Sequence, residues 1–357
     1  MVVIDVQQRR TCSVDTSHRN VRVMRLAWFF VVAACTTPPL PDAATGELGA
    51  WQMGPALPQQ IANHCSAVIE DWVLVIGGTY STPQGFAKTD LIQAAQLVDG
   101  VLGPWHLAGH TPSPVSECTA TSDGRSLYVI DGIYDNESDA RQVYTATLDA
   151  TGTLGALTSL GHLPTDTIVI SSEATVRQHE LLLMDTRLPT EGDKTVTLRS
   201  PLAAMAWTVD DWGVNFRAQS EYAFTDNFIY TIGGYHDPAI GAVTDVFVAP
   251  ATGGPAVPTS ALAAATGFGE AMAVDDWVFV VGGRAATFGN GTTQVQAAQI
   301  AADGTLGAWR MLPALPIART NYELSLVGDY LVATGGTPMG PGDGVVLVSQ
   351  VRFSQSQ

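Results

Sequence analysis

The sequence predicts an all-β fold made of six repeats of about 50 residues. Leu48-Gly49-Ala50-Trp51 recurs near the other end as Leu306-Gly307-Ala308-Trp309, and Pro-Ala-Leu-Pro follows four residues later in both places. Between these ends, strand-like runs ending in Gly-Gly recur at similar intervals. The composition includes 35 Gly and 20 Pro with only 14% charged residues, which favours short strands and tight turns over helices. Such a period, marked by tryptophans and glycine pairs, is typical of propeller blades or solenoid units.

Residues 1–34 are predicted to be a basic extension and a signal peptide, with Met1 or Met24 as the start. The apolar run 26–34 is too short to span a bilayer as a helix. It ends in small residues directly before Cys35, which resembles a bacterial lipobox and implies that Cys35 is lipidated. The alternative is a plain signal peptide that happens to contain Cys35. Thr36, rather than Asp, after the cysteine favours an outer-membrane lipoprotein of the bacterial cell envelope.

Residues 35–43 read as a tether, because Pro, Thr and Ala dominate without an apolar period. Residues 44–357 are then one domain. The formal net charge of the chain is −17, and removing residues 1–34 with their five arginines and two aspartates leaves −20. A domain this acidic repels nucleic acids and anionic lipid surfaces. We therefore expect no nucleic-acid partner and membrane attachment through the lipid anchor only.

Each repeat is predicted to run from an outer strand through a Pro-containing connection to a strand, a tight turn, a strand ending in Gly-Gly, a loop and a final strand. Acidic pairs such as Glu70-Asp71 and Asp275-Asp276 mark the tight turns, where Asp, Asn and Gly tolerate positive φ. We interpret them as turn geometry rather than as ligands. The six repeats span residues 44–97, 98–148, 149–202, 203–251, 252–301 and 302–353.

The glycine pairs do not form phosphate-binding loops, because each leads into an irregular loop rather than a helix. They are Gly77-Gly78, Gly233-Gly234, Gly282-Gly283 and Gly335-Gly336, with Asp131-Gly132 and Asp185-Thr186 in the second and third repeats. A strand ending in Gly-Gly with a tryptophan some 25 residues later resembles the Kelch repeat of galactose-oxidase-like β-propellers. The tryptophan series departs from this pattern at Leu157 and Pro258. The resemblance covers residues 44–353 and implies a six-bladed Kelch-type β-propeller with four-stranded blades.

The two ends of the domain predict how the ring closes. The domain begins with an outer strand near residues 48–52 and ends after a third strand, 345–353, with no further outer strand. The N-terminal strand should therefore complete the last blade, which removes an open edge at the seam.

Glutamates recur at one level of the predicted innermost strands. Four of them lie twelve residues before the first residue of the glycine pair or of its substitute. Cys65 takes this position in the first repeat, and Glu117 joins the set if its hairpin is two residues longer. An insertion of one residue would place Cys118 there instead. The candidate residues are Glu117, Glu173, Glu221, Glu270 and Glu323.

This set predicts either an acidic collar that binds a cation such as Ca²⁺ or a cationic ligand, or glutamates that point between blades and hydrogen-bond backbone groups. Arg217 and Arg319, each four residues before a glutamate, could help to neutralise the carboxylates. Apart from this possible Ca²⁺, we expect no cofactor.

His110, His162 and His236 are weaker candidates for a zinc or copper site, since all three are predicted on loops of one face. Their spacing does not force them together, so the alternative is three separate loop residues. Of the four cysteines, only Cys65 and Cys118 lie in the repeats. Because innermost strands of different blades do not hydrogen-bond, we do not expect their Cα atoms to be close enough for a disulfide.

The sequence favours a non-catalytic binding module: a monomeric, lipid-anchored, extracytoplasmic propeller that offers its loop face to a glycan or protein. Copper-radical oxidases and sialic-acid epimerases resemble this fold, but the copper ligands of the oxidases cannot be matched to this chain. No GxSxG signature is present either. The alternatives are a carbohydrate-active enzyme of epimerase or oxidase type that uses an acidic channel mouth, and a structural part of an envelope complex.

Overall fold

The computed structural model describes residues 44–164, 168–169, 173–187, 194–215, 217–236, 241–286, 289–337 and 342–353. Residues 1–43 lie outside the described part of the chain, so the signal peptide, the lipidation of Cys35 and the tether remain predictions. In the described part, no helix has the length and apolar character needed to cross a membrane.

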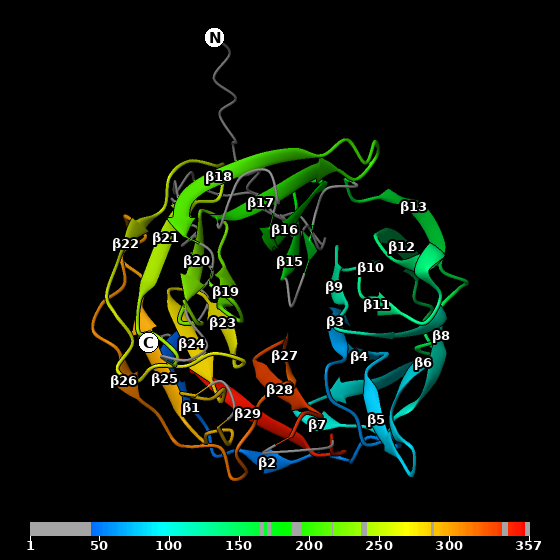
Figure 1. Ribbon diagram of the computed structural model, residues 1–357. Coiled ribbons are helices and arrows are strands. Elements are labelled where there is room, and N and C mark those ends of the chain that lie inside the picture. The colour runs from blue at the N-terminus through cyan, green and yellow to red at the C-terminus, as the bar shows by residue number, and fades with distance from the viewer. Residues whose placement is uncertain are drawn as a thin grey trace, which may run out of the picture. The chain divides into compact units, whose positions relative to one another are not determined.

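The described strands form six antiparallel sheets arranged around a central axis, which confirms the predicted six-bladed propeller (Figure 1). From the axis outward, blade 1 contains β3 (Cys65–Ile69), β4 (Trp72–Ile76), β6 (Gly85–Val98) and β8 (His106–Ser116). Blade 2 contains β9 (Thr119–Ser122), β10 (Ser126–Ile130), β12 (Gln142–Thr147) and β13 (Thr158–His162). Blade 3 contains β15 (Ala174–Arg177), β16 (Glu180–Arg187), β17 (Lys194–Pro201) and β18 (Thr208–Asn215).

The second half of the ring repeats this order. Blade 4 contains β19 (Glu221–Phe224), β20 (Phe228–Ile232), β21 (Val246–Pro250) and β22 (Val257–Pro258). Blade 5 contains β23 (Glu270–Val274), β24 (Trp277–Val281), β25 (Val295–Gln299) and β26 (Arg310–Met311). Blade 6 contains β27 (Glu323–Val327), β28 (Tyr330–Thr334), β29 (Val346–Phe353), and β1 (Ala44–Leu48) with β2 (Gln52–Met53). Short additions are β5 (Thr79–Thr82), β7 (Val101–Leu102), β11 (Ile133–Tyr134), β14 (Ile168–Val169) and the 3₁₀ turn Glu137–Asp139.

The hydrophobic core is divided into six clusters, and each lies between two neighbouring blades. In β4, Leu74 packs toward blade 2 while Val73 and Val75 pack toward blade 6. All three side chains are fully buried. Strands that are buried on both faces read as continuous apolar runs, which explains sequences such as Trp72–Ile76. The blades are therefore held together by side-chain burial, at about 1.5–3 kcal/mol for each large apolar residue.

The N-terminal strand closes the ring as predicted. Leu48 of β1 pairs with Val351 of β29, and Gln52 of β2 pairs with Val348 of the same strand. A further contact ties this strand to blade 5, because a Cβ at Gly46 would lie 2.3 Å from the ring of Trp277. Only glycine lets the backbone approach the indole so closely.

The same contact recurs around the ring and explains why an aromatic residue follows the tight turn in four of the blades. Trp72, Phe228 and Tyr330 each pack against a glycine of the next blade, as Trp277 does against Gly46. The partners are Gly152 for Trp72, Gly304 for Phe228 and Gly100 for Tyr330.

Outer-strand tryptophans make a second recurring link. The indole N–H groups of Trp105, Trp207 and Trp309 each donate to a backbone carbonyl 45 to 50 residues earlier, at 2.9 Å. The tryptophan series predicted from the sequence is wrong at Pro258. This residue pairs with Phe247, so it lies two positions beyond the site of the outer-strand tryptophan in the other blades. Sequence counting alone could not place this short strand.

Candidate functional site

Residues with positive φ surround the channel at the end from which the loops after the glycine pairs emerge, which we call the loop face. The described members are Asn63, Glu117, Gln219, Phe268 and Asn321, with φ between 52° and 60°. Their backbones form a directional chain, since the N–H of four of them donates to the carbonyl of the preceding blade's member. The bonds are Phe268 to Gln219 (3.3 Å), Asn321 to Phe268 (3.4 Å), Asn63 to Asn321 (3.2 Å) and Glu117 to Asn63 (2.8 Å).

Glu117 belongs to this ring rather than to the predicted level of the other glutamates. Thr119 pairs with Ile130 in blade 2, as Cys65 pairs with Ile76 in blade 1. Blade 2 therefore has no insertion in this hairpin, and Glu117 lies two residues before the strand position that the other glutamates occupy. Burial raises its pKa, an effect that the positive charge of Lys88 partly opposes.

The four other predicted carboxyls converge just inside this ring. Glu173, Glu221, Glu270 and Glu323 line one cavity of about 80 Å³. Three of them, all except Glu221, also border a second chamber of about 300 Å³ lined by the innermost strands. We call these four residues the carboxyl collar. It lies at the junction between the two cavities.

Burial makes the carboxyl collar largely neutral at physiological pH. Desolvation raises the pKa of Glu221 to about 8, although the backbone N–H of Gly269 and the charge of Arg217 oppose the shift. Desolvation likewise raises the pKa of Glu173 to about 7. The pKa values of Glu270 and Glu323 lie well above the ordinary range, because burial and neighbouring carboxyls both disfavour their charge.

Two collar carboxyls make bonds to the next blade. Oε1 of Glu221 accepts a hydrogen bond from the N–H of Gly269 at 2.9 Å, and Oε2 of Glu323 accepts one from the hydroxyl of Ser66 at 3.3 Å. Glutamates that point between blades and hydrogen-bond backbone groups were one of the two predicted alternatives. Glu221 has this form, whereas Glu323 points between blades but bonds to a side-chain hydroxyl. They leave Glu221 and Glu323 with roles in holding neighbouring blades together.

The predicted neutralisation by arginine holds for one pair only. Arg217 lowers the pKa of Glu221, whereas Arg319 forms an ion pair with Asp343 at 2.6 Å and also donates to the carbonyl of Gly335. The prediction for Arg319 was therefore wrong: its guanidinium extends along its own blade rather than toward Glu323.

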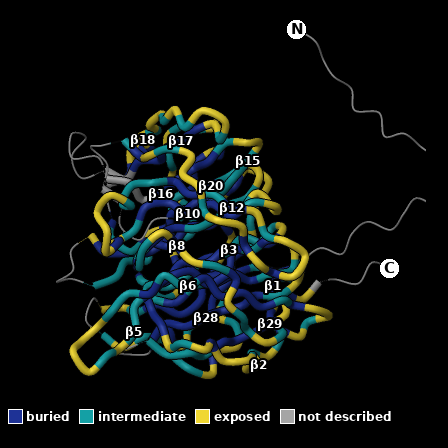
Figure 2. Tube along the Cα trace, turned by 90° about the vertical axis from the view of Figure 1, so that its right-hand side faces the viewer, coloured by how far each residue is buried: buried dark blue, intermediate teal, exposed yellow. Residues whose placement is uncertain are grey.

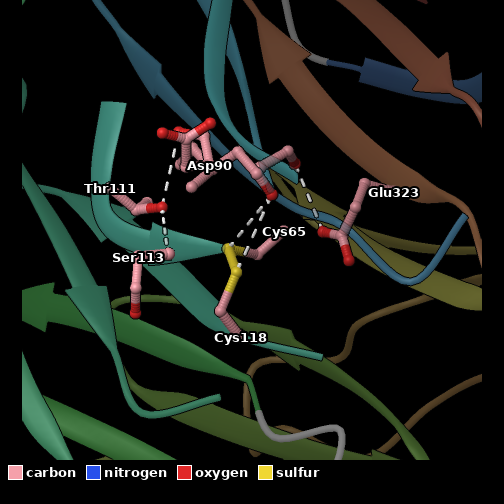
Figure 3. Close-up of a disulfide and its surroundings, with 8 residues drawn as sticks. Cys65, Asp90, Thr111, Ser113, Cys118 and Glu323 are labelled. Carbon is pink, nitrogen blue, oxygen red and sulfur yellow. Dashed lines mark hydrogen bonds between the residues drawn. A yellow bond between two sulfur atoms is a disulfide. The ribbon is translucent and has the colours of Figure 1, made fainter. Parts of the chain in front are cut away.

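Cys65 and Cys118 form a disulfide, contrary to the prediction (Figure 3). Their Cα atoms are 5.5 Å apart, within the range that a bridge requires. The prediction failed because it considered backbone pairing alone. Innermost strands of neighbouring blades lie side by side without sharing hydrogen bonds, and β3 and β9 do so here. Cys65 occupies the glutamate position of blade 1, and its side chain reaches the neighbouring blade.

The three candidate histidines have separate partners. His110 lies 3.1 Å from Asp90 and His162 lies 3.1 Å from Gln142, while His236 is 3.6 Å from Asp245. Across the described ranges, no three His, Cys, Asp or Glu side chains are grouped closely enough to hold a metal ion. The three histidines are therefore separate, as the second alternative had it, but the predicted loop positions are wrong for two of them: His110 lies within β8 and His162 is the last residue of β13.

Sequence reasoning missed His64, which lines the collar cavity. Its Nε2 lies 3.0 Å from the hydroxyl of Thr334, and burial lowers its pKa to about 3. It is therefore neutral at physiological pH. The equivalent positions in other blades are not histidines, so the repeat pattern carried no signal for it.

A wider pocket lies on the loop face, and sequence reasoning missed it too. Blade 1 carries an added hairpin of β5 and the start of β6, which projects from the ring with an exposed tip (Figure 2). This hairpin places Phe86, 69% exposed, beside residues of blades 5 and 6. The pocket, which we call the loop-face pocket, has a volume of about 420 Å³. Its lining is Ala62, Asn63, Thr79, Phe86, Arg284, Gly289, Thr320, Asn321, Thr337 and Gly342.

Comparison with known proteins supports the fold. No protein-family model matches the sequence, and no curated protein matches it. A solved structure titled "Structure of YjhT" matches with a TM-score of 0.64 at 14% sequence identity, covering 83% of this chain and 96% of that one. At this identity the likeness concerns the fold alone, and the relation to Kelch repeats stays a prediction. The chain is a six-bladed β-propeller with the same fold as YjhT.

Proposed function

We propose that the protein is a lipid-anchored, extracytoplasmic β-propeller that binds a glycan or protein at its loop face and catalyses no reaction. The loop-face pocket carries this proposal. Its volume of about 420 Å³ falls in the range of small-molecule sites, whereas the collar cavity of about 80 Å³ is far below it.

The lining of the loop-face pocket suits a sugar. Thr79, Asn321 and Thr337 offer hydroxyl and amide groups that can both donate and accept hydrogen bonds. Phe86 offers an exposed aromatic face. Pockets of this kind combine apolar contact with a few polar groups that fix orientation.

Two observations support binding rather than catalysis. Among the described residues that line the loop-face pocket there is no carboxyl, imidazole or thiol group, so general acid–base chemistry has no obvious agent there. In the carboxyl collar, Glu221 and Glu323 already bond to neighbouring blades.

The disulfide supports an extracytoplasmic location. Disulfides persist in oxidising compartments and are rare in the cytosol, and the Cys65–Cys118 bridge lies in the described domain. This agrees with the export signal expected from residues 1–34 and with a lipid on Cys35. We continue to expect a monomer and, from the net charge of the chain, no nucleic-acid partner.

A binding screen and a fractionation experiment test the proposal. The mature chain should bind at least one member of a glycan panel or a cell-surface protein, and Phe86→Ala should abolish that binding without lowering the Tm. Expressed in a bacterial host, the full chain should enter the membrane fraction, and Cys35→Ser should release it. Binding that survives Phe86→Ala would move the ligand away from the loop-face pocket.

A carbohydrate-active enzyme is the second candidate, and the pKa values of the carboxyl collar favour it. Carboxyls with a pKa of about 7 and 8, as for Glu173 and Glu221, suit a general acid near neutral pH. In that case Glu173→Gln should abolish turnover of a sugar while Phe86→Ala should leave turnover intact. Turnover with that pattern would replace the binding proposal.

A further inference from the structure

We propose that the loop-face pocket holds its ligand through a carboxylate that binds Arg284, and that the ligand is a sugar acid. This inference rests on the proposed function, because it names the ligand class of the same pocket.

The propeller scaffold does not require a charge at this position. Arg284 directly follows a glycine pair. The equivalent residues are Thr79, Ile133, Tyr235 and Thr337 in four other blades, and Arg187 in blade 3, where Asp185-Thr186 replaces the glycines. Thr79, Tyr235, Arg284 and Thr337 each form the same isolated backbone bridge to a residue ahead of the innermost strand. Because residues with uncharged side chains form the equivalent bridges, the fold does not need the guanidinium of Arg284 at this position.

The guanidinium of Arg284 is held in place by aromatic residues. Its central carbon lies 3.7 Å from the ring centroid of Phe268, and Tyr235 packs against the same phenyl ring at 5.7 Å. The hydroxyl of Tyr235 donates to the carbonyl of Arg284 at 2.9 Å and also interacts with its side chain. These contacts fix the plane of the guanidinium in advance, which lowers the entropy lost when a ligand binds.

Within the described part of the chain, no carboxylate forms an ion pair with Arg284. By contrast, Arg199, Arg310 and Arg319 each have an acidic partner within 4 Å. The Nε atom of Arg284 is buried and has no hydrogen-bond partner among the described residues. An arginine that is fixed, partly desolvated and without a counter-ion among the described residues of so acidic a chain favours a ligand that brings the negative charge.

The geometry favours a carboxylate on a sugar ring. A guanidinium presents two parallel N–H groups that match a carboxylate. On the same pocket wall, Nδ2 of Asn321 donates to Oδ1 of Asn63 at 2.6 Å, which orients both amides, and Thr337 adds a hydroxyl. Phe86 can cover the apolar face of a ring. Charge at one end and hydroxyl-binding groups at the other describe a sugar acid.

Calorimetric titration of the mature chain with matched sugars tests this inference. Glucuronate and galacturonate differ from glucose and galactose only in carrying a carboxylate at C6. We expect at least one hexuronate to bind about tenfold or more tightly than its neutral counterpart, the effect of one charge-assisted hydrogen bond or more. Arg284→Gln should remove this difference, and Arg284→Lys should restore only part of it because lysine cannot form the fork. Added salt should weaken hexuronate binding more than hexose binding.

The control is Arg125→Gln, which removes the same charge from an exposed turn between β9 and β10 and should leave both affinities unchanged. Equal affinity for a hexuronate and its hexose would overturn the carboxylate inference and leave the proposed function standing. If acidic peptides bind and hexuronates do not, the sugar assignment is wrong. Absence of any hexuronate binding also overturns it, while the Phe86→Ala experiment judges the proposed function separately.

Discussion

The carboxyl of Glu221 and the backbone N–H of Gly269 join blades 4 and 5 by a hydrogen bond of 2.9 Å. Cys65 and Cys118 occupy the same two positions in blades 1 and 2, where a disulfide joins them. In each pair, the first residue begins one innermost strand, at the position that the collar glutamates occupy. The second residue lies immediately before the corresponding position of the next blade. A covalent bond thus replaces a hydrogen bond at one boundary of the ring.

We predict that the protein loses stability as pH rises from about 5 to 8. A carboxyl whose pKa is raised to about 8 in the folded state binds more protons folded than unfolded between pH 4.5 and 8. Its contribution is therefore complete below pH 4.5 and is lost as pH rises through the folded pKa, with a slope of at most about 1.4 kcal/mol per pH unit for one group. Glu221→Gln keeps the acceptor for Gly269, so urea denaturation should show a flatter pH profile and higher stability at pH 8. An unchanged profile would mean that Glu221 ionises normally.

Removing the disulfide should destabilise the protein by up to about 4 kcal/mol, the chain-entropy value for a loop of this length. The two cysteines are separated by 53 residues. The measurement is guanidinium denaturation of Cys65→Ser/Cys118→Ser beside the oxidised parent. Cys65→Glu/Cys118→Ala should be more stable at pH 5 than Cys65→Ala/Cys118→Ala, since the glutamate could accept from the backbone N–H of residue 118. Equal stability of oxidised and reduced parent would count against the bridge.

Deleting residues 44–54 should destabilise blade 6 in particular. The deletion removes β1 and β2, both of which pair with β29, and leaves the edge of β29 open. Hydrogen exchange should show lost protection across Val346–Phe353, together with a lower Tm. Deleting residues 36–43 is the control, and it should leave both unchanged. Full protection of β29 after the longer deletion would refute the closure.

Asp343→Ala should cost about 3 kcal/mol or more, because it leaves the guanidinium of Arg319 buried without its counter-ion. Arg319 is 1% exposed, and its Nη1 lies 2.6 Å from Asp343. The comparison is Asp135→Ala, which breaks the surface pair with Lys88 and should cost less than about 1 kcal/mol. Similar losses for both variants would show that the Arg319 pair contributes no more than a surface one.

The parts of the fold that depend on positions within one sheet were predictable from the sequence. Glycine pairs, tight turns and the missing last strand gave six blades and their closure, since strand periodicity and turn chemistry act locally. Relations between blades were not predictable in the same way. Whether Cys65 reaches Cys118 depends on strand tilt around the axis. Within blade 6, residue spacing also did not fix which carboxyl Arg319 contacts, because that depends on the direction of its side chain.

The candidate site also has one part that sequence counting predicted and another part that it did not. Counting from the glycine pairs placed Glu173, Glu221, Glu270 and Glu323 at one level, and the structure brings them together. Glu117 was misplaced by two residues because its hairpin was taken to be two residues longer, whereas Thr119 pairs with Ile130 just as Cys65 pairs with Ile76. The repeat pattern did not predict the loop-face pocket, because Phe86 and Arg284, which line the pocket, depart from the pattern.

Closure by the first strand sets the order in which the ring can be completed. Ribosomes make chains from the N-terminus, so Ala44–Leu48 is synthesised before any blade and acquires its partner only when Val346–Phe353 appears. Joining segments so far apart in the chain carries a large loop-closure entropy and slows folding. A nascent or terminated chain that lacks Val346–Phe353 therefore has no finished ring, and only a chain that includes this strand can complete it.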